Sequence, residues 1–284
     1  MGLSVSARRV GIGVVAYLIA TWIAVVAVDG ANLWGLRDAL EEGPVSPPAL
    51  WQQLYAEGQV TEWLQWGCLA ALALTAARLS GWLGRGGDHA AARCWMVFAL
   101  LGALLLLEDA GNLRHTIARF AGWATQHPVA AFLSETMLFY VLAAVAFFPW
   151  VAYRGELLRW RVPMGFLVGG YVAYATAGLM SATRGIGLWY ERAGQWLGDR
   201  LMPDGLVLLG LEHGYATDDA TAFYLMDSLV EESIELIAAT LLLMAALTYA
   251  TRHREAVQGP PAADEAESRP EGPLSNSPSQ DDRA

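Results

Sequence analysis

Apolar residues occur along this chain in long runs, and polar segments rich in Pro, Gly, Arg and acidic residues separate the runs. Each run approaches the about 20 residues that a helix needs to cross a hydrocarbon core of roughly 30 Å. Helices are required there because backbone polar groups in lipid must find partners within the segment. The pattern predicts an all-α polytopic membrane protein, a bundle of about six transmembrane helices with short external interfacial helices. We place the long helices at residues 10–28, 61–79, 94–112, 129–153, 162–182 and 221–249.

Two of the polar segments are long enough to hold helices of their own. In residues 29–60, Pro48 is suited to open a short helix, and in residues 183–220 apolar positions recur near helical spacing. Both patterns predict external helices that lie at the membrane interface. Their apolar positions are Leu50, Trp51, Leu54 and Tyr55 in the first segment and Leu188, Trp189, Trp196 and Leu197 in the second.

The two ends of the chain differ in character. Residues 255–284 contain mainly small, polar and acidic residues and Pro, so we expect a disordered acidic tail after a transmembrane domain of residues 1–254. At the other end, Arg8 and Arg9 precede the first apolar run, as in a signal peptide. The apolar region of such peptides has about 7–15 residues, and the run at 10–28 is longer. We therefore expect it to be retained as a helix.

Composition supports a lipid environment and limits the partners. Hydrophobic residues make up 55% of the chain, which contains 12 tryptophans, and this exceeds what a soluble domain of this length normally buries. The formal net charge of −10 argues against a nucleic-acid partner. The lipid bilayer is the expected partner, and the external helices or the acidic tail are candidate contacts for a membrane or cytoplasmic protein.

The positions of the arginines predict the orientation. Groups of them occur before the first predicted helix, after the second, between the fourth and fifth, and after the sixth. The opposite side also carries arginines, but the loop between the fifth and sixth helices, which holds three of them, is strongly acidic; these five are Arg114, Arg119, Arg184, Arg192 and Arg200. Short cytoplasmic loops of membrane proteins carry an excess of basic residues. We therefore expect an inner-membrane protein of a bacterium with both termini in the cytoplasm.

The most informative feature is a set of carboxylates inside segments that otherwise suit lipid. A charged residue in the middle of a membrane helix costs about 2.5–3.5 kcal/mol, so these acids need partners or a function. They are Glu108 and Asp109 on the third predicted helix, Glu135 on the fourth, and Asp227, Glu231, Glu232 and Glu235 on the sixth.

Helical spacing brings several of these acids together. Asp227, Glu231 and Glu235 are four residues apart and share one helix face. On the third helix, the i, i+4, i+7 spacing of Glu108, Asn112 and His115 predicts one polar stripe. Glu108, Glu135 and Asp227 each lie roughly 9–10 Å from the external ends of their helices. We expect a polar site between helices three, four and six that opens to the outside.

Three interpretations of this site are open. The first is a cation site, for which a divalent metal ion suits the mixture of carboxylates with one imidazole. Such a metal could serve transport, or it could activate water with Glu232 or Glu235 as general base, so the chain is not assigned as an enzyme. The candidate ligands are Glu108, Asp109, Asn112, His115, Glu135, Asp227 and Glu231.

The second interpretation is a proton or cation pathway along the acids of helix six. The third is a non-catalytic membrane subunit or assembly factor, whose buried acids only fix helix register by pairing with Arg184, Asn112 or similar groups.

The acidic segments also resemble those of a known group. Uncharacterised bacterial multi-pass membrane proteins carry an acidic pair followed by a His on one helix and paired glutamates on the last. The matching residues here are Glu108 and Asp109 with His115, and Glu231 and Glu232 with Glu235. The resemblance implies that the two segments work together, and it implies no particular activity.

Overall fold

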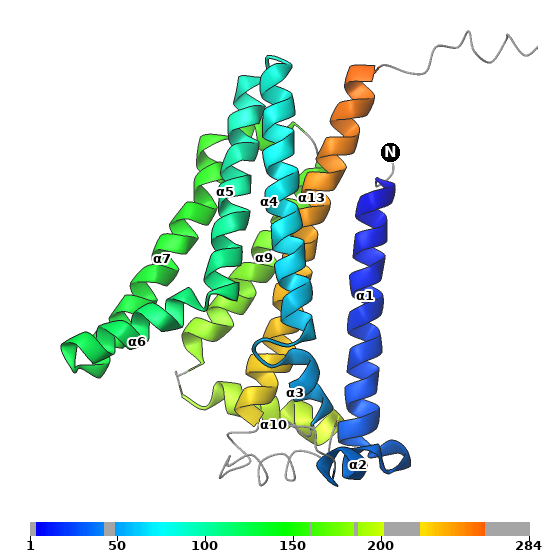
Figure 1. Cartoon of the computed structure of the whole chain (residues 1–284), viewed down its shortest axis with the longest axis vertical. Coiled ribbons are helices and arrows are strands. Elements are labelled where there is room, and N and C mark those ends of the chain that lie inside the picture. Colours follow the sequence, from blue (N-terminus) through cyan, green and yellow to red (C-terminus); the bar gives the residue numbers. More distant parts are fainter. Residues whose placement is uncertain (1–3, 43–48, 160, 185–186, 202–221, 259–284) are drawn as a thin grey trace, which may run out of the picture.

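All regular secondary structure in the described residues is helical, and a computed structural model of the chain shows how the helices assemble (Figure 1). The structure describes residues 4–42, 49–159, 161–184, 187–201 and 222–258. The long helices are α1 (Val5–Val25), α4 (Val60–Arg85), α5 (His89–Ala110), α7 (Pro128–Ala152), α9 (Arg161–Thr183) and α13 (Glu232–Gln258). The short elements are η1 (Val26–Gly30), η2 (Leu33–Gly35), α2 (Leu36–Glu42), α3 (Leu50–Tyr55), α6 (Leu113–Thr125), α8 (Arg154–Leu158), α10 (Trp189–Leu201) and η3 (Leu225–Glu231).

The described residues contain 5 helical segments that are long and apolar enough to cross a membrane. The chain is therefore a multi-pass membrane protein, and the prediction of an all-α polytopic bundle is confirmed. The segments are Val5–Gly30, Leu50–Arg85, His89–Ala110, Arg161–Thr183 and Ala222–Val257.

Helix α7 connects the two ends of the bundle. It starts after α6, near the end where α5 stops, and it leads to α8 at the end where α9 begins (Figure 1). Its described apolar stretch, Thr136–Ala152, is shorter than the other segments. The whole helix has 25 residues, which is about 37 Å at 1.5 Å per residue. The path of the chain thus agrees with the helix predicted at residues 129–153.

Helix α13 lies at the centre of the bundle, where it packs along α9, α4 and α1. Small residues permit these close contacts: a Cβ atom at Gly170 would lie 2.7 Å from Cδ2 of Leu242. Helices α4 and α5 approach in the same way, since a Cβ atom at Gly102 would lie 3.3 Å from the backbone nitrogen of Ala73. Small residues at such crossings let membrane helices pack without a hydrophobic driving force.

The helix predicted at 94–112 ends earlier than expected. Helix α5 stops at Ala110, and Asn112 has a φ of 43°, in the left-handed region. Asn tolerates this conformation better than most residues, and the chain turns there into the separate helix α6. The single stripe predicted for Glu108, Asn112 and His115 was therefore wrong, because no continuous helix joins them.

The external segments are partly as predicted. Helix α10 is present in the second segment, and Trp196 on it is exposed. Helix α3 is present in the first segment, and its apolar residues pack against the bundle: Trp51 and Tyr55 are only 2% and 0% exposed. Its position at the membrane interface stays a prediction. Helix α13 continues to Gln258, so residues 255–258 of the predicted tail are helical, and residues 259–284 of that tail lie outside the described part.

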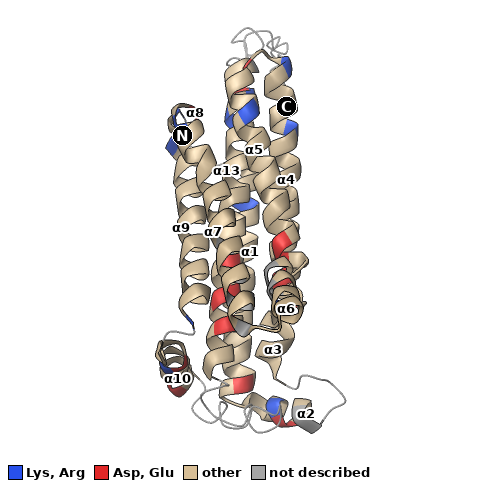
Figure 2. Cartoon of the chain, turned by 90° about the vertical axis from the view of Figure 1, so that its left-hand side faces the viewer, with Lys and Arg blue, Asp and Glu red and all other residues tan. Residues whose placement is uncertain are grey.

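Charge is unevenly distributed along the bundle axis. Arginines gather at the end that holds the start of α1 and the end of α13, whereas acidic residues gather toward the other end (Figure 2). This acidic half contains the end of α5, the start of α4 and the element η3.

Candidate functional site

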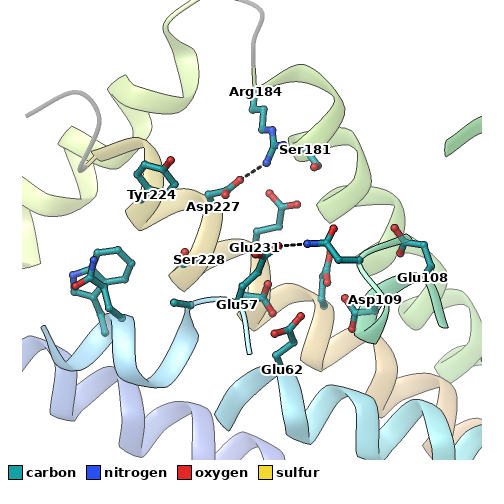
Figure 3. Close-up of a pocket in the computed structure, with 16 residues that line it drawn as sticks. Glu57, Glu62, Glu108, Asp109, Ser181, Arg184, Tyr224, Asp227, Ser228 and Glu231 are labelled. Atoms are coloured by element: carbon teal, nitrogen blue, oxygen red, sulfur yellow. Dashed lines mark hydrogen bonds and ion pairs between the residues drawn. The ribbon is translucent and has the colours of Figure 1, made fainter. Parts of the chain in front are cut away.

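An acidic cavity of about 410 Å³ lies in this half of the bundle. Its wall comes from α3, the start of α4, the end of α5, the end of α9 and the segment η3–α13 (Figure 3). The lining residues are Trp51, Gln52, Ala56, Glu57, Glu62, Glu108, Asp109, Asn112, Ser181, Arg184, Tyr224, Asp227, Ser228, Glu231, Glu232 and Glu235.

Negative charge dominates the wall of the cavity. Among the described lining residues, Arg184 is the one basic side chain. Its Nη1 lies 2.8 Å from Oδ1 of Asp227, and the two side chains are 29% and 24% exposed. This ion pair neutralises one carboxylate near the end of α9 and leaves the wall acidic.

The element η3 positions much of the acidic wall. It is a π-helix over Leu225–Glu231 and leads directly into the α-helix α13. Short π-helical turns insert one extra residue into a helix and occur frequently at functional sites. Asp227, Glu231 and Glu232 all line the cavity from this region, and Glu235 follows on α13.

The end of α5 forms the opposite wall. Glu108 and Asp109 lie in its last turn, directly before the break at Asn112. Asn112 Nδ2 donates a hydrogen bond of 2.7 Å to Oε1 of Glu57, which precedes α4. The break therefore turns the amide of Asn112 toward the start of α4, where Glu62 accepts a hydrogen bond from the backbone N–H of Gly58.

Gln65 joins the two acidic walls. Its side chain is buried, at 1% exposure, and its Nε2 donates to Oδ2 of Asp109 at 2.7 Å and to Oε2 of Glu235 at 2.9 Å. One amide from α4 thus holds carboxylates from α5 and α13 at a common depth. The shared donor offsets part of the repulsion between these two carboxylates.

Helix α10 packs against η3 beside the cavity. The hydroxyl of Tyr190 donates a 2.5 Å hydrogen bond to Oε2 of Glu231, and Tyr190 is fully buried. Burial raises the pKa of this phenol, and the neighbouring carboxylate of Glu231 acts in the same direction. Gly194 lets the helix sit close, because a Cβ atom there would lie 1.9 Å from the carbonyl oxygen of Ala222.

Asp29 positions α3, which forms another part of the cavity wall. Asp29 lies in the π-helix η1 and is 0% exposed. Its two carboxylate oxygens accept hydrogen bonds from the backbone N–H groups of Leu50, at 2.9 Å, and Trp51, at 2.7 Å. An acidic side chain that accepts from the first turn of a helix stabilises it, so Asp29 orients α3 and the residues Trp51 and Gln52.

Most of the residues predicted for the site are brought together. Those that line the cavity are Glu108, Asp109, Asn112, Asp227, Glu231, Glu232 and Glu235. The side chains of His115 and Glu135 lie outside the described part of the structure. No described residue of α7 lines the cavity, and within the described part α3, α4 and α9 complete its wall.

Sequence reasoning missed the contribution of α4. Glu62 and Gln65 lie on one helix face at i, i+3 spacing, at the start of the helix predicted from residue 61. Two polar residues on one face of a membrane helix are a usable signal for an inward orientation. Glu57 and Gln52 gave no comparable signal because both lie in a segment that was predicted to be external.

A preformed metal centre is not evident in this part of the chain. Within the described residues, no group of three His, Cys, Asp or Glu side chains is arranged to hold a metal ion. The assignment of Glu108, Asp109, Asn112, His115, Glu135, Asp227 and Glu231 as metal ligands stays a prediction.

Comparisons with protein-family models, with curated proteins and with solved structures find no match to this chain. Function is therefore inferred from the cavity.

Proposed function

We propose that this membrane protein binds a cation in the acidic cavity. One observation carries the proposal: a space of about 410 Å³ inside a membrane bundle is walled by carboxylates from α4, α5 and η3–α13, with Arg184 as the one basic side chain among its described lining residues. Carboxylates that share a poorly solvated site repel one another, and a bound cation relieves both the repulsion and the loss of hydration.

The distribution of charge supports access from the outside. Arginines gather at the end that holds the start of α1 and the end of α13 (Figure 2), and the positive-inside rule assigns such an end to the cytoplasm. The cavity lies toward the other end, and in a bacterial inner membrane it would then take its cation from the external side.

The apolar core between the cavity and the arginine-rich end favours a site that the cation enters from the external side only. After Glu235, the buried residues of α13 include Leu236, Ala238, Ala239 and Leu242. At this level Cys68 and Thr240 hydrogen-bond to each other, with 3.8 Å between Sγ and Oγ1. In the described residues, apolar packing thus separates the cavity from the arginine-rich end. Ion transport and a role of Glu232 or Glu235 as general base both stay predictions.

A second candidate function is a non-catalytic subunit whose acids fix helix register. The pair Arg184–Asp227 and the hydrogen bond from Asn112 to Glu57 support it. This interpretation gives no reason for a cavity of this size among the acids, so we place cation binding first.

Thermal unfolding of the detergent-purified full chain tests the proposal. The unfolding midpoint is measured with Mg²⁺, Mn²⁺, Ca²⁺ or spermidine at constant ionic strength, since a ligand at about 100 times its Kd stabilises by about 2.7 kcal/mol. We expect at least one of these cations to raise the midpoint.

Two variants locate the effect. Glu231→Gln removes a buried charge from the cavity but keeps an acceptor for Tyr190, and it should reduce the shift. Asp199→Asn removes an exposed charge on α10 outside the cavity, and it should leave the shift unchanged. The proposal fails if no cation stabilises the protein, or if the shift is the same in Glu231→Gln as in the wild type.

A further inference from the structure

We propose that the cation is an organic polyamine, a chain of methylene groups with two or more ammonium groups, and this inference rests on the proposed function. It identifies the class of ligand, which cation binding alone leaves open. Its support comes from the spacing of the acids, from buried acceptors without donors, and from the size and lining of the cavity.

The acids are spread along the cavity instead of converging on a point. No group of three potential ligands in the described residues is placed to hold a metal ion, although direct coordination needs oxygens within about 2.0–2.6 Å of one centre. Asp227 is already paired with Arg184, and the deeper acids Glu231 and Glu235 are four residues apart along η3–α13, which is roughly 5–6 Å of helix. An elongated ligand with separated positive charges fits acids at several depths better than a single metal ion does.

Buried acceptors in the wall point to a ligand that donates hydrogen bonds. Gln52 lines the cavity and is 6% exposed, and its Oε1 is buried with no hydrogen-bond partner in the described residues. Oε2 of Glu232 is also buried and has no hydrogen-bond partner in the described residues. Buried polar atoms are nearly always hydrogen-bonded, and an ammonium group offers three donors and no acceptor. It therefore complements these oxygens without adding an unmatched acceptor.

The size and the aromatic residues of the cavity suit an alkyl chain between charges. A volume of about 410 Å³ falls in the range of roughly 300–1,000 Å³ that small-molecule sites occupy. Trp51 and Tyr224 also line the cavity. Aromatic rings attract ammonium groups through their π faces and pack against methylene groups. Arg184 and its partner Asp227 lie at the side of α9 and leave the deeper acids to the ligand.

Equilibrium binding to the detergent-purified full chain tests this inference. Calorimetric titrations at fixed ionic strength use spermidine, 1,4-diaminobutane, butylamine, Mg²⁺ and Mn²⁺. We expect stoichiometric binding of spermidine or diaminobutane, about ten-fold or more tighter than that of butylamine, because a second ammonium group adds a second ion pair at low dielectric.

Variants and outcomes keep the inference distinct from the proposed function. Gln52→Met removes the buried acceptor at similar volume, and Glu231→Gln removes a charge; each should weaken spermidine binding, whereas Asp199→Asn should not. Binding of Mg²⁺ or Mn²⁺ without spermidine would overturn the polyamine inference and keep the cation site. Absence of binding by every probe would overturn both. Spermidine binding that neither cavity variant changes would place it on surface acids and also overturn the inference.

Discussion

Replacing Gln65 by methionine should destabilise the bundle strongly, although the residue is neutral and the change keeps its volume. Gln65 is 1% exposed and donates to Asp109 and Glu235 from a single Nε2 atom, at 2.7 and 2.9 Å. Methionine keeps the length and the packing volume but has no donor. Both carboxylates then lose the group that holds them together across α4, α5 and α13.

The size of the effect follows from the two bonds. Hydrogen bonds between membrane helices contribute about 1–2 kcal/mol in model systems, and those to charged groups about 1.5–3 kcal/mol. Because a methionine removes both of these hydrogen bonds, we expect a loss of about 2–4 kcal/mol. The equilibrium constant for unfolding then rises by about 30-fold or more.

Equilibrium unfolding in mixed detergent–SDS micelles measures this loss. Gln59→Met is the matched control, since Gln59 precedes α4, is half-buried and makes no capping hydrogen bond with its side chain. If Gln65→Met unfolds within about 0.5 kcal/mol of the wild type, a size expected of surface substitutions, the bridge does not stabilise the fold and the argument for a shared acidic wall is wrong.

Further predictions concern the contact of α10 with η3, the charge of the cavity and the helical register of η3. Burial and the neighbouring Glu231 raise the pKa of Tyr190 above its ordinary value near 10, so the unfolded chain loses this proton first and stability should fall above about pH 10; Tyr190→Phe should reduce that fall in alkaline unfolding experiments. Arg184→Gln should tighten cation binding by about three- to ten-fold in the same titrations, because it frees the carboxylate of Asp227. Deletion of Val230 should convert η3 into α-helix, rotate the preceding residues by about 100°, and abolish binding while circular dichroism shows unchanged helix content; Val230→Ala, which keeps the extra residue, should bind normally.

Hydropathy predicted the long helices well because lipid imposes a simple requirement on them. The segments predicted at 10–28, 61–79 and 162–182 fall within Val5–Gly30, Val60–Arg85 and Arg161–Thr183. The presence of α10 was also predictable from its alternating apolar and charged sides. Each of these elements needs only local information: length, apolar content and helical period.

Features that depend on tertiary contacts were not predictable in the same way. Gly111 and Asn112 are a sequence signal for the end of α5. The direction in which the chain then turns was not predictable, because it depends on the packing of α6 and on the contact of Asn112 with Glu57. The polar character of residues 29–60 predicted an external loop, but it did not predict that Asp29 is buried and holds α3 against the bundle. A buried carboxylate that satisfies backbone donors has the same composition as an exposed one, so sequence pattern alone does not separate them.

The two π-helical elements explain why the acidic half of the bundle differs from the rest. Both η1 and η3 occur at this end, one following α1 and the other preceding α13, and each contains acids that face the interior: Asp29 in the first, Asp227 and Glu231 in the second. A wider turn offsets the residues on either side of it relative to a regular helix. In η3 this lets Asp227 reach Arg184 and Glu231 reach Tyr190, while Glu235 on the regular helix still meets Gln65. In a regular helix, acids at four-residue spacing would all lie on one face. The extra residue of the π-helix changes their directions, so that they contact partners on α4, α9 and α10.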